Sequence, residues 1–239
     1  AVARQLGSPG KRAMLARLQR AARPGHVRAV AAGLQQGRLA SSSLAQPPPA
    51  FVKTVPPGDD KERDMCPQCN RIVYSNPLPV GGAVVHDADP ATGEPRVLLL
   101  RRDIEPRKGF WTLPGGFLEN GESVADGSAR EALEEANADV EVTGLHAVHS
   151  VPGRSLIMLW FKARFRQPTP PPGQEDTRFS AGHETAEARL FTQSQLPWDE
   201  LAFPVGRLAL QQFFADPSSD AVRYCEVDAT EGDTAKGRA

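Results

Sequence analysis

Three glutamates within five positions, Glu131, Glu134 and Glu135, form the cluster in this sequence whose spacing could support chemistry. Solvated helix faces usually place Lys three or four residues from Glu, because such pairs are mildly stabilising. Here the nearest basic residue is Arg130 alone. Carboxylate oxygens gathered on one face favour Mg²⁺ or Mn²⁺ over zinc or copper. The spacing therefore indicates a divalent-metal site, and an ordinary solvated acidic face is the alternative.

Two adjacent glycines, Gly115 and Gly116, precede the glutamates in a loop punctuated by further glycines. Glycine adopts backbone angles that other residues avoid, so this loop can approach a ligand closely. Divalent metals of this class commonly share their coordination with phosphate oxygens. A metal beside a tight glycine loop indicates phosphoryl or pyrophosphate chemistry.

A helix over residues 124–137 is the element that must position the glutamates. Ser123 is a good N-cap, and Asp126 follows three residues later as in a capping box. At helical spacing the glutamates share one side of this segment, and the other side is nearly all alanine. The helix should therefore lie close against a sheet. The apolar side consists of Ala125, Ala129, Ala132, Leu133 and Ala136.

Segments on either side of this helix supply that sheet. Apolar runs bounded by turn residues predict a hairpin, then further strands after the helix. A proline near the start of a later apolar segment predicts a second helix, and a proline-rich polar stretch predicts a long surface loop. The predicted hairpin strands are 79–87 and 97–102, the later strands 140–151, 155–165 and 186–191, the second helix 203–216 and the loop 166–184.

One pattern unites the glycine loop and the acidic helix. Gly-x5-Glu-x7-Arg-Glu-hydrophobic-x-Glu-Glu is the Nudix box, and this segment resembles the Nudix hydrolase family. The box usually ends in glycine, whereas this sequence has Asn137. Asparagine tolerates the left-handed conformation of a helix C-cap, so we expect the loop–helix–loop to survive. The matching positions are Gly116, Glu122, Arg130, Glu131, Glu134 and Glu135.

The resemblance implies an α/β fold, the Nudix α/β/α sandwich with a mixed sheet, over residues 77–216. It implies hydrolysis of a nucleoside diphosphate linked to another group. By the same analogy, Arg130 orients the carboxylates through charge-assisted hydrogen bonds. Glu122 binds a further metal or supports the loop. The implied ligands of Mg²⁺ (or Mn²⁺) are Glu131, Glu134, Glu135, Glu122 and Glu187.

The general base varies within this family. Catalytic candidates are Glu134 and Glu131 of the box, and Glu187 from a later loop, with Glu184 as the weaker choice. A solvated strand edge is the alternative role for the two later glutamates. Candidates for substrate binding are Gly115, Gly116, Trp111 and Arg102. Trp111, with Phe110 and Trp160, could stack on a base or flavin ring, although aromatic residues also build cores.

Residues 53–215 resemble plant plastid-type ADP-ribose/FAD pyrophosphatases and their bacterial relatives. Hydrolysis of FAD would give FMN and AMP, and hydrolysis of ADP-ribose would give AMP and ribose 5-phosphate. NADH or a nucleotide sugar is an alternative substrate. A non-catalytic nucleotide sensor is an alternative of another class. Relatives are often homodimers, which is the assembly we expect.

Residues 51–76 contain a Cys-x-x-Cys knuckle, Cys66 and Cys69, that resembles half of a zinc ribbon. A structural zinc needs four ligands, and Cys225 lies far along the chain. We therefore expect zinc to be absent unless a partner chain completes the knuckle. Three cysteines give no disulfide framework and suit a reducing compartment.

Charge divides the chain unevenly. Residues 1–58 contain nine Lys or Arg and no Asp or Glu, which leaves 19 basic and 29 acidic residues, a net charge of −10, in the remainder. An Arg-rich, acid-free start predicts a transit peptide or disordered segment over residues 1–50. Plastid and mitochondrial transit compositions overlap, and it is the resemblance to plastid-type enzymes that favours a plastid over a mitochondrion. A basic tail that touches nucleic acid is the alternative, although the acidic remainder argues against nucleic acid as a partner.

Two further expectations concern the rest of the chain. No apolar run approaches the ~18 residues of a transmembrane helix, so no membrane span is expected. The polar, small-residue stretch 217–239 is expected to be a flexible tail.

Overall fold

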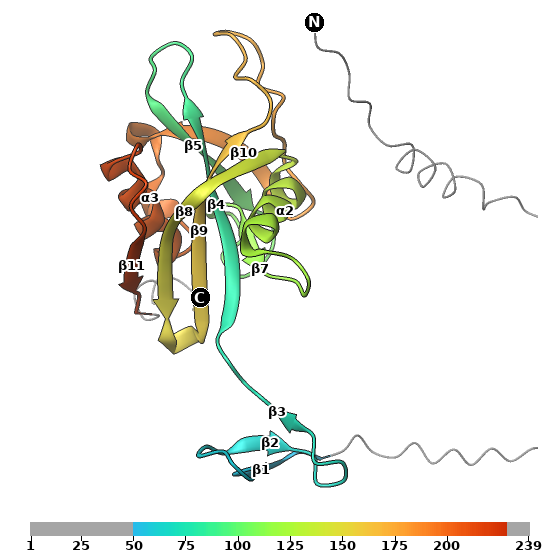
Figure 1. Ribbon diagram of the computed structural model, residues 1–239. Coiled ribbons are helices and arrows are strands. Elements are labelled where there is room, and N and C mark those ends of the chain that lie inside the picture. The colour runs from blue at the N-terminus through green and yellow to red at the C-terminus, as the bar shows by residue number, and fades with distance from the viewer. Residues whose placement is uncertain (1–49, 229–239) are drawn as a thin grey trace, which may run out of the picture. The chain divides into compact units, whose positions relative to one another are not determined.

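The computed structural model describes residues 50–228, which include an eight-stranded mixed sheet with helices on both faces (Figure 1). Its strands run in the order β10-β5-β4-β9-β8-β11, with β6 paired to β5 and β7 to β4. The predicted α/β class and mixed sheet are confirmed, because β4 is antiparallel to β5 but parallel to β9. The strands are β4 (Leu78–Ala88), β5 (Pro95–Arg102), β6 (Trp111–Thr112), β7 (Gly115–Phe117), β8 (Val140–Val151), β9 (Leu156–Phe165), β10 (Thr185–Thr192) and β11 (Arg223–Glu226).

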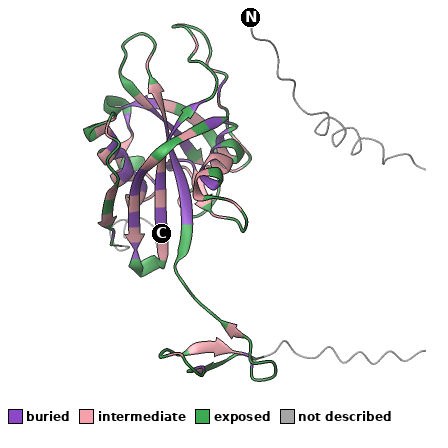
Figure 2. Ribbon diagram, viewed as in Figure 1, coloured by how far each residue is buried: buried purple, intermediate pink, exposed green. Residues whose placement is uncertain are grey.

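Alternation along the central strands divides the core in two. Successive side chains of a strand point to opposite faces, so one strand serves both layers. Val84 and Leu99 lie in the core under helix α3 (Pro204–Ala215), whereas Ala83 and Leu98 lie under helix α2 (Val124–Ala136). Figure 2 shows the resulting buried band along the middle of the sheet. The same strand therefore packs against both helices.

Helix α2 (Val124–Ala136) carries the glutamates and agrees with the predicted helix. The Ser123 side chain accepts a hydrogen bond from the Asp126 N–H, as the capping pattern predicts. Asn137 ends the helix in the left-handed conformation, with φ of 48°. Ala132 and Ala136 are fully buried, so the alanine face brings the helix axis close to the sheet.

Helix α3 (Pro204–Ala215) covers the opposite face, with proline in its first turn as predicted. Phe213 and Leu210 are its fully buried anchors. Three short 3-10 turns complete this part of the chain: the first joins β8 to β9, and the other two lie between β10 and α3. They are η1 (Pro152–Arg154), η2 (Gln193–Gln195) and η3 (Trp198–Glu200).

The knuckle region forms a small sheet of its own, in the order β1-β2-β3. Its strands are β1 (Val52–Thr54), β2 (Arg63–Met65) and β3 (Ile72–Val73), and both pairings are antiparallel. The turn between β2 and β3 holds the two cysteines of the predicted knuckle.

Strand β11 lies where the sequence predicts a flexible tail, so that expectation is wrong for residues 223–226. It pairs in parallel with β8 at the edge of the sheet. Lys162 of β9 donates hydrogen bonds to the carbonyl oxygens of Pro217 (2.8 Å) and Ser219 (2.5 Å). These long-range contacts hold the segment that precedes β11.

Two further predictions concern the transit peptide and membrane-spanning helices. The transit-peptide prediction falls almost wholly on residues 1–49, which lie outside the described residues. Across residues 50–228, no helix has both the length and the apolar character needed to cross a membrane.

Candidate active site

Arg130 lies at the centre of the acidic cluster, which comprises Glu131, Glu134 and Glu135 of α2 together with Glu122 just before the helix. Its guanidinium Nε and Nη2 donate to both carboxylate oxygens of Glu122, at 3.0 and 2.9 Å. Its Nη1 donates to Glu131 (2.7 Å) and to Glu134 (3.0 Å). Nη2 also reaches the carbonyl oxygen of Phe117 at 3.1 Å. Arg130 therefore makes charge-assisted hydrogen bonds to three carboxylates, which is what the predicted orienting role requires.

This network perturbs the carboxylates in opposite directions. Hydrogen bonds from Arg130, and then from the Glu119 N–H, hold the pKa of Glu122 at about 2. Burial raises the pKa of Glu131, although Arg130 opposes that rise. Glu134 is the exposed member, with a side chain 53 % exposed. Glu122 is therefore firmly ionised, whereas the hydrogen bond from Arg130 does not fully offset the effect of burial on Glu131.

Glu135 contacts the glycine loop rather than Arg130. Its Oε2 accepts a 2.9 Å hydrogen bond from the Gly115 N–H. Burial raises the pKa of Glu135 to about 7, and the negative charges of Glu131 and Glu184 add to the rise. A carboxylate destabilised in this way gains from any cation that binds beside it.

Gly116 brings the loop against the second half-buried carboxylate. A Cβ atom at this position would lie 2.6 Å from Glu131 Oε1. Only glycine therefore allows β7 to pass so close to the helix. Gly115 is similarly constrained, since its Cβ would lie 2.8 Å from the Gly81 carbonyl oxygen. The same two glycines also line a cavity.

That cavity has a volume of about 390 Å³. Its walls are mostly apolar, and its arginines supply positive charge. The Trp160 indole N–H lies buried in the wall without a hydrogen-bond partner among the described residues. The lining includes Gly115, Gly116, Phe117, Arg102, Arg107, Arg154, Met158, Trp160, Phe203 and Val227.

The predicted substrate-binding residues divide between this cavity and the core. Arg102 lines the cavity with its guanidinium 5.3 Å from the Phe203 ring centroid. Trp111 instead packs edge-on against Phe191, at 4.9 Å, and is 6 % exposed. The structure thus places Trp111 in the core, and Trp160 is the tryptophan at the cavity.

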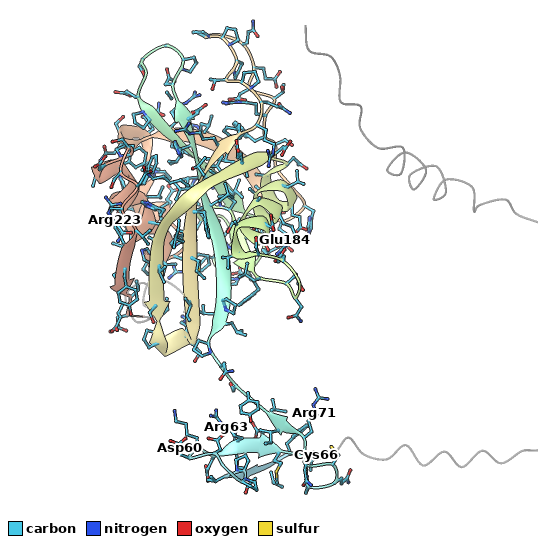
Figure 3. The ribbon with its side chains drawn as sticks, in the orientation of Figure 1. Asp60, Arg63, Cys66, Arg71, Glu184 and Arg223 are labelled. Atoms are coloured by element: carbon cyan, nitrogen blue, oxygen red, sulfur yellow. The ribbon has the colours of Figure 1, made fainter. Side chains whose placement is uncertain are left out.

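The two later glutamates also separate. Glu187 lies on edge strand β10, half-exposed, with its carboxylate 4.0 Å from Arg101. Glu184 belongs to the segment that contacts the end of α2, where the Gly182 N–H donates to the Glu135 carbonyl oxygen at 2.9 Å. Figure 3 shows Glu184 beside α2. The structure therefore brings Glu184, more than Glu187, to the acidic cluster.

The acidic cluster fits a divalent cation by its chemistry. Across residues 50–228, no three His, Cys, Asp or Glu side chains are already gathered around one point as ligands. Glu131 and Glu134 instead share the cationic Arg130, and Glu135 holds a backbone N–H. All of the donors are oxygens, and two are half-buried carboxylates with raised pKa values, which suits Mg²⁺ or Mn²⁺.

The cysteine knuckle supplies two free thiols. Cys66 is buried and Cys69 is exposed. Backbone N–H groups of Cys69 and Gln68 hydrogen-bond the Cys66 sulfur and lower the pKa of that thiol. No third side chain among the described residues joins them as a metal ligand.

Comparisons with known proteins find curated relatives that match part of this chain. Curated relatives include an ADP-ribose pyrophosphatase of Methanocaldococcus jannaschii, 42 % identical over 59 residues, which are 25 % of this chain and 35 % of that protein. A MutT-like protein of Streptomyces ambofaciens is 36 % identical over 85 residues, which are 36 % of this chain and 49 % of that protein. The chain thus spans only about a third to a half of the length of these curated relatives.

A solved structure gives a longer match. The crystal structure of a Nudix hydrolase from Nitrosomonas europaea superposes with a TM-score of 0.62 at 34 % identity. The match covers 74 % of this chain and 94 % of that chain. The family model described as the NUDIX domain matches residues 78–213, which include α2, the acidic cluster and most of α3. The chain therefore belongs to the Nudix family.

Proposed function

We propose that this chain hydrolyses the diphosphate bond of a nucleoside diphosphate linked to a second group, with ADP-ribose as the first candidate and FAD as the second. The observation that carries the proposal is that Gly115 and Gly116 line the cavity and also lie against Glu135 and Glu131. A ligand in the cavity can therefore place its diphosphate beside Gly115 and Gly116, where neither residue has a side chain that would keep it from the acidic cluster.

The cavity supports a dinucleotide-like ligand. Its apolar walls suit a base or flavin ring, and its arginines suit phosphate oxygens. The relative from M. jannaschii is an ADP-ribose pyrophosphatase, which favours ADP-ribose. The resemblance to plant plastid-type enzymes keeps FAD as the second candidate.

The chemistry is attack of water on one phosphorus. The new P–O bond forms as the bridging P–O bond breaks, and two phosphate monoesters result. Mg²⁺ or Mn²⁺ held by Glu131, Glu134 and Glu135 would neutralise the diphosphate and acidify a water molecule. Arg130 would keep Glu131 and Glu134 oriented, and Glu184 would accept the proton from the attacking water. Glu122 would support the loop through Arg130.

A panel of substrates tests this proposal. Full-length protein is incubated with ADP-ribose, FAD, NADH or a nucleotide sugar at equal concentration, with and without Mg²⁺, and products are separated by chromatography. We expect AMP from the preferred dinucleotide, ranked by kcat/KM. EDTA and Glu134→Gln should abolish the release, whereas Glu141→Gln, an exposed carboxylate on β8, should not.

The sensor alternative predicts a different result. Tight binding of a dinucleotide without release of AMP, in the presence of Mg²⁺ or Mn²⁺, would support a non-catalytic module. Release of AMP that is equal in wild type and Glu134→Gln would contradict the assignment of the acidic cluster.

We further propose a homodimer and delivery to a plastid, with a mitochondrion as the alternative. Both rest on the resemblance and on the composition of residues 1–50. Light scattering of the purified chain tests the dimer. A fluorescent protein fused after residue 50 tests the destination.

A further inference from the structure

The C-terminal turn of α2 is held by the segment 180–184. The Ser180 N–H donates to the Ala136 carbonyl oxygen at 2.8 Å, and the Gly182 N–H donates to that of Glu135 at 2.9 Å. Carbonyl groups in the last turn of a helix lack partners within the helix. Here a distant part of the chain satisfies two of them, so the segment is attached directly to the turn that carries Glu134 and Glu135.

Asn137 adds a second attachment through its side chain. Its Nδ2 donates to Ser180 Oγ at 3.0 Å and to the Ala181 carbonyl oxygen at 3.2 Å. Its backbone N–H, in the left-handed conformation, closes the helix onto Ala132. Glycine, which usually stands at this position of the Nudix box, could make the backbone bond but not the two side-chain bonds. Asn137 therefore does more than end the helix.

Gly182 shows how close the attachment is. A Cβ atom there would overlap the carbonyl oxygen of Glu134 and lie 2.8 Å from that of Glu135. Two residues later, the Glu184 carbonyl oxygen accepts a 2.9 Å hydrogen bond from the Asp103 N–H, just after β5. The segment is thus fixed at α2 by one end and at β5 by the other.

We propose that Asn137 is a positioning residue that ties the segment 180–184 to α2 and so sets the place of Glu184 relative to Glu134 and Glu135. This inference rests on the proposed function, because it assigns the tie to the hydrolytic site. The amide side chain takes over a task that glycine cannot perform at the end of the box.

Asn137→Gly separates the two roles of this residue. Glycine is favoured in the left-handed region, so the helix cap should persist and Tm should stay within about 3 °C of wild type. Loss of two side-chain hydrogen bonds should speed amide hydrogen exchange in residues 178–185 by about five- to tenfold. We expect kcat to fall by a similar factor, with KM little changed and more Mg²⁺ needed for half-maximal rate.

A matched control comes from the knuckle. Asn70, in the turn between β2 and β3, is also in the left-handed region, with φ of 57°, so Asn70→Gly makes the same replacement away from the large sheet. It should change neither the exchange of residues 178–185 nor kcat. Ser180→Ala, which removes one acceptor of the Asn137 amide, should give a weaker form of the Asn137→Gly result. The double variant should be no worse than Asn137→Gly alone.

The outcomes are distinct. Unchanged exchange or unchanged kcat in Asn137→Gly overturns the positioning role. Gly182→Ala should reproduce the faster amide exchange, because its Cβ would push the segment away from α2. This variant replaces Asn137→Gly in the test if Asn137→Gly does not fold. If wild type hydrolyses no dinucleotide, the proposed function fails on its own, while the exchange measurements still decide whether Asn137 holds the segment.

Discussion

The backbone N–H of Gly115 donates a 2.9 Å hydrogen bond to Glu135, which joins the cavity lining to the acidic helix. This one contact links the two halves of the proposed site. It also holds a carboxylate whose pKa is raised to about 7, chiefly by burial. The free energy of unfolding should therefore depend on pH through the ionisation of Glu135.

Glu135→Gln should stabilise the metal-free protein at pH 8. The folded-state pKa lies above the ordinary value of 4.5, so the folded state binds this proton more tightly than the unfolded state. Stability consequently falls as pH rises from about 4.5 to about 7. Glutamine keeps an acceptor for Gly115 without the charge. We expect a gain of about 1–3 kcal/mol at pH 8 that shrinks toward pH 5, measured by urea unfolding in EDTA. A gain independent of pH would contradict this cause.

Gly116→Ala should impair catalysis by moving the loop away from the helix. The new Cβ would lie 2.6 Å from Glu131 Oε1, so either β7 or the carboxylate must shift. We expect kcat/KM to fall by at least about tenfold, because small displacements of catalytic groups are costly. Gly144→Ala is the control, since its Cβ meets no atom within 4 Å. Equal activities of the two variants would remove the proposed role of this close approach.

Arg130→Lys should weaken the acidic cluster although the charge is kept. The guanidinium bonds three carboxylates and a carbonyl oxygen at once, which an ammonium group cannot reproduce. We expect a loss of about 1–3 kcal/mol in stability and a lower kcat, followed by thermal unfolding and AMP release. Arg166→Lys, at an exposed pair with Asp139, should be nearly neutral. Similar stability losses in both variants would argue against a special network.

Lys162→Met should loosen the C-terminal strand and the cavity wall. The buried ammonium group donates to the Pro217 and Ser219 carbonyl oxygens, and Val227, just after β11, lines the cavity. Methionine preserves the apolar stem but donates nothing. We expect a loss of about 1–3 kcal/mol and a higher KM, with faster amide exchange in residues 217–228. Lys53→Met, an exposed residue paired with Asp64, should change stability by less than about 0.5 kcal/mol. An unchanged KM would show that β11 does not shape the substrate site.

Local sequence signals predicted the elements that carry the site. Ser123 and Asp126 locate the start of α2, Asn137 locates its end, and the alanine face predicts its contact with the sheet. Such signals act within a few residues, through caps and side-chain periodicity, so they can be read without knowledge of the fold. The six spaced residues of the box identified the family in the same way.

Packing between distant segments decided the rest. The sequence around Trp111 does not show whether this side chain contacts a ligand or packs in the core. Its edge-on contact with Phe191, which comes from a distant strand, places it in the core. Glu184 reaches α2 only because Gly182 can touch the end of the helix. Strand β11 exists through its pairing with β8.

By itself, the sequence determined which residues carry charge, where the acidic helix begins and ends, and which family the chain resembles. The tertiary structure decided which carboxylates are partly buried, which three of them Arg130 binds and which later glutamate lies near them. The reason is physical: helix caps and periodicity depend on neighbours along the chain, whereas burial and pKa depend on atoms brought together by folding.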